Sequence, residues 1–240
     1  MRKWIAACLL PLFAGCTQAQ TVPDDAVKAA ICRPLFQVDG AALDAGTAFV
    51  LDPGTAKPLL VTAMHLFGPD GGLPEQIEWN ALPGRAISVD CTPLAEGSVL
   101  KGGAALALPG AHAHAPGVLR DIAAFALNAA GPKPKSILHL ADTAPRTGET
   151  VWLLAQAVGG APATQLLHRA VVGHSGDDTL QYFFDNKTLE LRATSGAPVL
   201  DGQGRVVGIN LGGGLLKDGR MLGFATPLKS IREALAGARP

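Results

Sequence analysis

Three side chains in this sequence have the types and the order that nucleophilic acyl transfer requires. His65 stands in "LLVTAMHLFG", Asp121 in "LRDIAAFAL" and Ser195 in "ATSGAPVL". A serine hydroxyl becomes a good nucleophile when an imidazole accepts its proton, and a carboxylate fixes the tautomer of that imidazole. The chain order differs from that of α/β-hydrolases and of subtilisins. The pattern predicts Ser195 as nucleophile, His65 as general base and Asp121 as the orienting carboxylate.

Each of these residues also fits a structural role when it is taken alone. A serine among small residues is typical of a turn, a single histidine of a core, and an aspartate of a strand end. His112 and His114 form an H-x-H pair that could bind zinc, but the sequence offers no obvious third ligand. We therefore predict neither a metal nor a cofactor.

The motifs, taken together, resemble chymotrypsin-like (trypsin-fold) serine peptidases, nearest to bacterial secreted and high-temperature-requirement-type members without a PDZ domain. "VTAMH" resembles the family's Thr-Ala-x-His, "RDIA" its Asp-Ile-Ala, and "TSGAPVLDGQGRVVGIN" its Ser-Gly-Gly-Pro segment with the following hairpin. "GFATPLKSI" is similar to the closing strand and helix of that bacterial branch, and the likeness spans about residues 46–235. The resemblance implies an all-β fold of two packed antiparallel barrels and a peptide or protein substrate.

The resemblance also implies that the backbone N–H groups of Ala193 and Ser195 form the oxyanion hole. The family usually has glycine at the position of Ala193, because the turn can require a conformation that a Cβ disfavours by about 1–2 kcal/mol. Either the fold absorbs this strain, or the peptide flips and one donor is lost. The second outcome would leave a weak or inactive peptide-binding protein.

Activation and specificity follow from the same resemblance. Thr194 replaces the aspartate that pairs with a new N-terminus in trypsin-type members, so local hydrogen bonds must hold the turn instead. Leu189 would form the floor of the primary pocket, which favours small or apolar side chains unless Glu190 or Asp185 turns inward. One wall, open to β-augmentation by substrate, would consist of Asn210, Leu211, Gly212 and Gly213.

The composition favours a body of many short strands. The chain has 240 residues, 48% of them hydrophobic, and a formal net charge of zero, which gives no reason to expect a nucleic-acid partner. Apolar runs bounded by turn signals predict strands at 46–51, 59–62, 85–90, 122–127, 151–156, 166–172, 180–184, 198–200 and 206–211. We expect barrel one at about 33–130, barrel two at about 135–225 and an amphipathic helix at 226–236. Thr226 would cap that helix, with Pro227 at its first position.

The first residues have the features of an export signal. Arg2 and Lys3 precede an apolar stretch, 4–14, that is too short to span a bilayer. It ends in Phe-Ala-Gly-Cys16, which resembles a bacterial lipobox and favours cleavage before Cys16, lipidation of that cysteine and an envelope location, periplasmic or at the outer membrane. The alternative is ordinary cleavage after Ala19 and a secreted soluble protein. We assign 1–19 to the signal region and 20–240 to the peptidase-like domain.

Two further features concern the start of that domain. Residues 24–32 could form a short helix capped by Asp24 or Asp25. Export would place Cys32 and Cys91 in an oxidising compartment, where they could form a disulfide. Such a bridge would close a loop of roughly sixty residues and stabilise the fold by about 4 kcal/mol. The alternative is two separate buried thiols.

Overall fold

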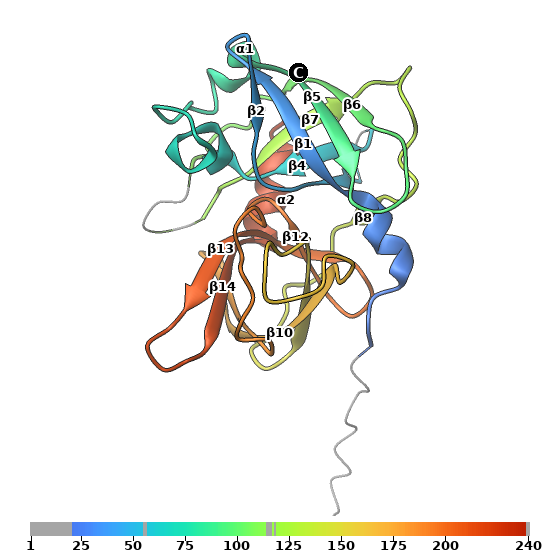
Figure 1. The fold of residues 1–240 in the computed structure, drawn as a ribbon. Helices are drawn as coiled ribbons and strands as arrows, with labels where there is room; N and C mark the ends of the chain where they lie inside the picture. The colour runs from blue at the N-terminus through green and yellow to red at the C-terminus, as the bar shows by residue number, and fades with distance from the viewer. Residues whose placement is uncertain (1–20, 55–56, 114–116, 118, 239–240) are drawn as a thin grey trace, which may run out of the picture.

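The computed structural model describes residues 21–54, 57–113, 117 and 119–238, which form two β-barrels with one helix at their junction (Figure 1). The expected all-β class, with two antiparallel barrels and a C-terminal helix, is confirmed. In this described part, no helix combines the length and the apolar character needed to cross a membrane.

Six strands close the first barrel in the order β1-β5-β6-β7-β4-β3, because β1 pairs with both β5 and β3. These strands are β1 (Ile31–Val38), β3 (Ala48–Asp52), β4 (Leu59–Thr62), β5 (Ala86–Pro93), β6 (Leu100–Ala105) and β7 (Ala123–Leu127). Two short strands are attached to them: β2 (Ala41–Asp44) pairs with β1, and β8 (Leu138–His139) runs parallel to β3. Three short helices also belong to this region: Met64–Phe67, Pro69–Gly71 and α1 (Leu82–Arg85).

The short helix predicted at 24–32 is present, but it ends two residues earlier than predicted. Asp24 does cap a helix, since its side chain accepts from the N–H of Ala26, but the helix is of the 3-10 type and ends at Ala30. From Ile31 the chain alternates between buried and more exposed positions, with Phe36 and Val38 pointing into the core. Alternation with a period of two is that of a strand with one buried face.

Both faces of β3 and β4 are buried. Val50 and Leu60 point into the first barrel, whereas Phe49 and Val61 belong to the apolar cluster between the barrels and the C-terminal helix. Strands buried on both faces appear in a sequence as continuous apolar runs. This is why they were predictable, and it places the residues that follow β4 at the barrel junction.

The second barrel is closed in the order β10-β11-β14-β13-β12-β9. Its strands are β9 (Thr150–Leu154), β10 (Leu167–Ser175), β11 (Leu180–Phe184), β12 (Pro198–Leu200), β13 (Val206–Leu215) and β14 (Met221–Pro227). The interior is filled by apolar residues that include Leu153, Val172 and Tyr182.

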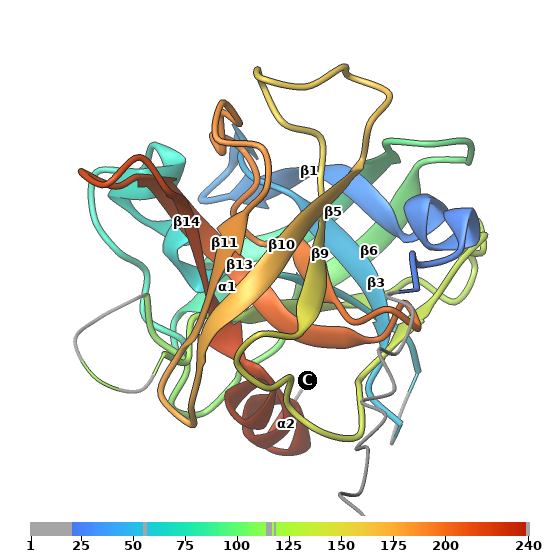
Figure 2. The same cartoon turned by 90° about the horizontal axis from the view of Figure 1, so that it is seen from below.

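Helix α2 (Leu228–Ala236) packs Leu228, Ile231 and Leu235 inward, as their spacing predicts, and Figure 2 shows it beside the second barrel. The start of α2 lies one residue later than expected. Pro227 is the cap residue, Thr226 is the penultimate residue of β14, and the Thr226 hydroxyl donates to Asp121 O at 2.9 Å instead of to the helix.

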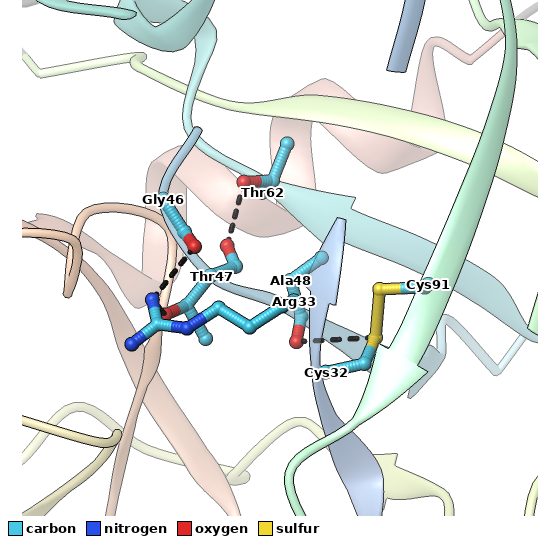
Figure 3. Close-up of a disulfide and its surroundings, with 7 residues drawn as sticks. All are labelled: Cys32, Arg33, Gly46, Thr47, Ala48, Thr62 and Cys91. Carbon is cyan, nitrogen blue, oxygen red and sulfur yellow. Dashed lines mark hydrogen bonds between the residues drawn. A yellow bond between two sulfur atoms is a disulfide. The ribbon is translucent and has the colours of Figure 1, made fainter. Parts of the chain in front are cut away.

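The predicted disulfide is present. Cys32 of β1 and Cys91 of β5 are bonded (Figure 3), and both are buried in the first-barrel core. Because β1 and β5 are neighbouring antiparallel strands, the bridge fixes one end of β1 against the barrel wall. Arg33, the residue after Cys32, points from that end toward Gly46 and Thr47 (Figure 3).

Candidate active site

His65 and Asp121, both supplied by the first barrel, form a buried pair. His65 lies in the 3-10 helix Met64–Phe67 directly after β4, and Asp121 lies two residues before β7. His65 Nδ1 is 2.8 Å from Asp121 Oδ2, and the backbone N–H of His65 donates to Asp121 Oδ1 at 3.0 Å. A carboxylate can only accept, so Nδ1 carries the proton and Nε2 is left as the basic nitrogen.

The burial of Asp121 makes this pairing necessary. Its side chain is 0% exposed and that of His65 is 4% exposed. A carboxylate removed from water is stable only when its oxygens accept hydrogen bonds or meet a cation. Thr226 of β14 adds a contact from the second barrel through the Asp121 carbonyl, so both barrels hold this residue.

The turn that carries Ser195 is docked against the first barrel. Ser195 O accepts from Thr47 N at 2.8 Å. Gly196 has φ +84°, and a Cβ there would lie 2.3 Å from both Thr47 O and Thr62 Oγ1 and 3.0 Å from Ala63 N. Only glycine fits such an approach. The serine turn thus rests on the segment that leads directly into His65.

Hydrogen bonds within the second barrel also hold the turn, and Thr194 has the role expected for it. The Thr194 hydroxyl donates to Leu191 O at 2.6 Å, and Asn210 Nδ2 donates to Thr194 O at 3.0 Å. Tyr182 donates to Asn210 Oδ1 at 2.6 Å, and burial raises the pKa of its phenol, which keeps this donor protonated. Tyr182, Asn210 and Thr194 are fully buried. A buried chain of this kind fixes one geometry when every member is paired.

Ala193 has the left-handed backbone that a glycine would adopt easily. Its φ is +60°, one of two positive values among the described non-glycine residues. The cost for alanine is about 1–2 kcal/mol. Ala193 and Ser195 donate their N–H groups to no acceptor in the described part of the chain, whereas Thr194 N–H donates to Leu191 O. The turn therefore presents two unpaired donors, one on each side of Thr194.

The carbonyl of Ala193 is bound by the first barrel. Arg33 Nη1 donates to Ala193 O at 2.6 Å, and the Thr47 hydroxyl donates to the same oxygen at 2.8 Å. Burial lowers the pKa of the Arg33 guanidinium and Asp44 opposes this shift, but an arginine stays protonated at any physiological pH. No sequence motif singled out Arg33 or Thr47.

The predicted pocket wall divides into two parts. Asn210 donates its N–H to Ala197 O and accepts from Gly196 N, and its side chain belongs to the buried network, so its polar groups are used inside the protein. Leu211 is 4% exposed, and its carbonyl accepts from Ser195 Oγ at 3.1 Å. β13 pairs with β12 only up to Ile209, so within the described chain Gly212 and Gly213 are paired on the β14 side alone.

Leu189, the predicted pocket floor, is an apolar buried residue. Leu189 is 3% exposed and packs in the core of the second barrel. Glu190 and Asp185 would make the pocket acidic if they turned inward, but both form ion pairs with arginines. Glu190 lies 3.1 Å from Arg192, and Asp185 is bound to Arg169. Their side chains are 53% and 52% exposed, respectively.

Some predicted features fall outside the described residues, and the H-x-H pair is described only at His112. Cys16, the signal region and His114 are outside the described residues. His112 Nδ1 lies 2.8 Å from Ala113 O. Among the described residues, no three histidine, cysteine or acidic side chains are grouped as a metal site would require.

Comparisons with known proteins place this geometry in a family. The trypsin-like peptidase domain matches residues 46–209. The fold is similar to the active form of the Rv3671c protease from M. tuberculosis, with a TM-score of 0.54 and 20% identity over 96% of this chain and 94% of that one. It is also similar to the serine endoprotease from Yersinia pestis, with a TM-score of 0.57 and 16% identity over 90% and 66% of the two chains. The search of curated proteins found no match. The family match covers more than half of the chain, which therefore belongs to the trypsin-like peptidases.

Proposed function

We propose that this protein is an exported serine endopeptidase that cleaves peptide bonds through an acyl-enzyme on Ser195. The observation that carries the proposal is the buried pair of His65 and Asp121, next to which the Ser195 turn is docked. Asp121 fixes the tautomer of His65, and His65 Nε2 is the base for the Ser195 proton.

Without substrate, the Ser195 hydroxyl donates a hydrogen bond to Leu211 O. The reaction starts when this hydrogen bond breaks and the hydroxyl donates to His65 instead. As the hydroxyl turns to His65, Nε2 takes its proton while Oγ bonds to the substrate carbonyl carbon. The tetrahedral intermediate collapses when the C–N bond breaks and the imidazolium gives its proton to the leaving amine. Water, activated by the same nitrogen, then attacks the ester and releases the acid and free Ser195.

The N–H groups of Ala193 and Ser195 stabilise the oxyanion in both tetrahedral intermediates. They are the two donors that the turn leaves unpaired. A pre-oriented donor of this kind contributes about 10²–10³ in kcat. Ala193 at φ +60° has the conformation that a glycine in this turn would supply, so alanine does not prevent the hole from forming.

The substrate lies as an extended strand along the open edge of β13. Gly212 and Gly213 leave backbone groups on that edge available for β-augmentation. The apolar Leu189 and the outward pairing of Glu190 and Asp185 favour a small or apolar side chain before the cleaved bond.

Turnover of a peptide library tests this proposal. Wild type should cleave peptides with small or apolar residues before the scissile bond, and Ser195→Ala should lose about six orders of magnitude in kcat. Cleavage that survives Ser195→Ala in clean protein would contradict the mechanism.

A catalytically inactive peptide-binding protein is the second candidate. The contact of Ser195 Oγ with Leu211 O favours it, because this contact directs the nucleophile's proton to a carbonyl. Peptides bound with measurable affinity but left intact by both wild type and Ala193→Gly would support this alternative.

The envelope location is proposed from the leader alone. If Cys16 carries lipid, Cys16→Ser should release the protein from membranes or leave the leader uncleaved. A mature N-terminus at Gln20, found by mass spectrometry of the processed protein, would instead indicate the secreted form.

A further inference from the structure

The guanidinium of Arg33 donates hydrogen bonds to four acceptors, all of them outside β1. Its guanidinium donates to Ala193 O at 2.6 Å, to Gly46 O at 2.9 Å, and to Thr47 Oγ1 and Gln156 O at 3.2 Å each. These acceptors come from the loop before β3, from the serine turn and from the residues after β9. The side chain is half-buried and lies where the two barrels meet.

The shortest of these bonds goes to the strained residue. At Ala193, φ sets the direction of the N–H that faces the substrate. A rotation of the preceding peptide toward negative φ would suit alanine better and would turn this donor away. The carbonyl of the same residue receives both Arg33 and the Thr47 hydroxyl, which itself contacts Arg33. The two donors hold the Ala193 carbonyl in place. In that geometry the Ala193 N–H remains available to bind the oxyanion.

We propose that Arg33, together with Thr47, is a positioning clamp that holds Ala193 in its left-handed conformation and so keeps the oxyanion hole formed. This inference rests on the proposed peptidase function. The clamp comes from the first barrel, and it acts where trypsin-type relatives use a buried N-terminal amine against an aspartate that this chain lacks. A charged donor to a carbonyl is among the stronger hydrogen bonds in proteins. The disulfide at Cys32 holds the strand from which the clamp extends.

The kinetic test compares Arg33→Met, which keeps much of the aliphatic stem, with wild type. We expect kcat to fall about 10–100-fold while KM changes less than about twofold, because the lost interaction supports the transition state and not substrate binding. Arg85→Met is the matched control, since Arg85 forms an exposed pair with Asp39 on the same barrel. That variant should keep the wild-type kcat.

A second substitution tests whether Arg33 positions Ala193 or only stabilises the fold. Glycine has no preference for negative φ, so Ala193→Gly in the Arg33→Met background should restore most of the lost kcat, and much more than it adds to wild type. If Arg33 only stabilised the fold, Ala193→Gly would give the same factor in both backgrounds. Thr47→Val, which removes one donor without changing the shape, should act in the same direction if Arg33→Met does not fold.

Hydrogen exchange distinguishes failure of the clamp from failure of the proposed function. In Arg33→Met, the amides of residues 189–197 should exchange faster than in wild type, while those of β5 and β6 keep their rates. An inactive wild type with this exchange pattern would end the peptidase proposal and leave the clamp in place. An active wild type whose kcat and exchange are unchanged by Arg33→Met would overturn the clamp.

Discussion

His65 and Asp121 contact each other within the first barrel, whereas Ser195 stands in a second-barrel turn whose carbonyls bind residues of the first. The pair has ordinary backbone geometry and a short, buried contact of 2.8 Å. The turn contains a left-handed alanine, a glycine with no room for a Cβ, and hydrogen bonds to Thr47 and Arg33.

The two parts of the proposed site, the His65–Asp121 pair and the Ser195 turn, therefore depend on different kinds of contact. In the proposed mechanism, the general base His65 needs one carboxylate, that of Asp121, and the burial of this carboxylate makes the pairing necessary. The nucleophile and its oxyanion donors depend on several weaker contacts across the barrel junction. We therefore expect a change at the pair to have a large effect on kcat, and changes at the contacts that support the Ser195 turn to have graded effects.

Among substitutions that leave the nucleophile Ser195 in place, the largest expected effect is at the pair of His65 and Asp121. Asp121→Asn keeps the shape but presents an amide that can donate to Nδ1, which favours the wrong tautomer of His65. We expect kcat to fall about 10⁴-fold at neutral pH. Asp90→Asn is the control, since Asp90 forms an exposed pair with Lys101 and should leave kcat unchanged. Equal losses in the two variants would contradict a special role for Asp121.

Removal of the disulfide should have the next largest effect, and on stability. Cys32→Ala combined with Cys91→Ala frees a loop closed by a sequence separation of 59. The free energy of unfolding should fall by about 4 kcal/mol, because the bridge restricts the unfolded chain. Denaturant unfolding measures this loss. A change below about 1 kcal/mol would mean that the barrel fixes β1 without the bridge.

The buried network behind the serine turn should give a smaller effect. Thr194→Val removes the hydroxyl that donates to Leu191 O and accepts from Asn210 Nδ2. One unpaired buried group costs about 1–3 kcal/mol, so labelling of Ser195 by a fluorophosphonate should slow by about one order of magnitude. Thr188→Val is the control, because Thr188 lies on an exposed loop. No slowing in Thr194→Val would show that contacts across the barrel junction suffice.

The smallest expected effect is a pH dependence of stability at His168, a buried histidine that is not part of the proposed triad. Burial lowers the pKa of His168, which lies inside the second barrel with Nε2 3.1 Å from Ala155 O. Below the ordinary histidine value near 6.5 the unfolded chain binds this proton first, so stability falls as pH decreases and is complete above that value. His168→Gln should remove up to about 1.4 kcal/mol per pH unit of this slope.

Much of the fold could be predicted because its signals are local. The interiors of β3, β4 and β9 are apolar runs, and the N–H of Gly54 donates to Asp52 Oδ1 at 2.8 Å in the turn between β3 and β4. β6 was missed because it contains two glycines. One of them, Gly102, leaves no room for a Cβ beside Val89, so packing and not propensity makes this segment a strand.

Only the parts of the candidate site that lie within short sequence motifs were predictable. His65, Asp121 and Ser195 were predicted as site residues from their types, order and strand contexts, and Thr194 was singled out because it replaces an aspartate. Arg33 is separated from Ala193 by 160 positions, and no short motif encodes a contact that depends on how two barrels dock. The same applies to Thr226, whose partner is Asp121 across the junction.

The most direct test of the central claim is the reaction of wild-type protein with a fluorophosphonate, followed by intact mass and peptide mapping. The probe bonds to a serine that has a working base and oxyanion hole, so it reports on both halves of the site together. We predict one adduct per chain, located on Ser195 and absent in Ser195→Ala. Folded wild-type protein that gains no adduct, or gains it at another serine, would contradict the account.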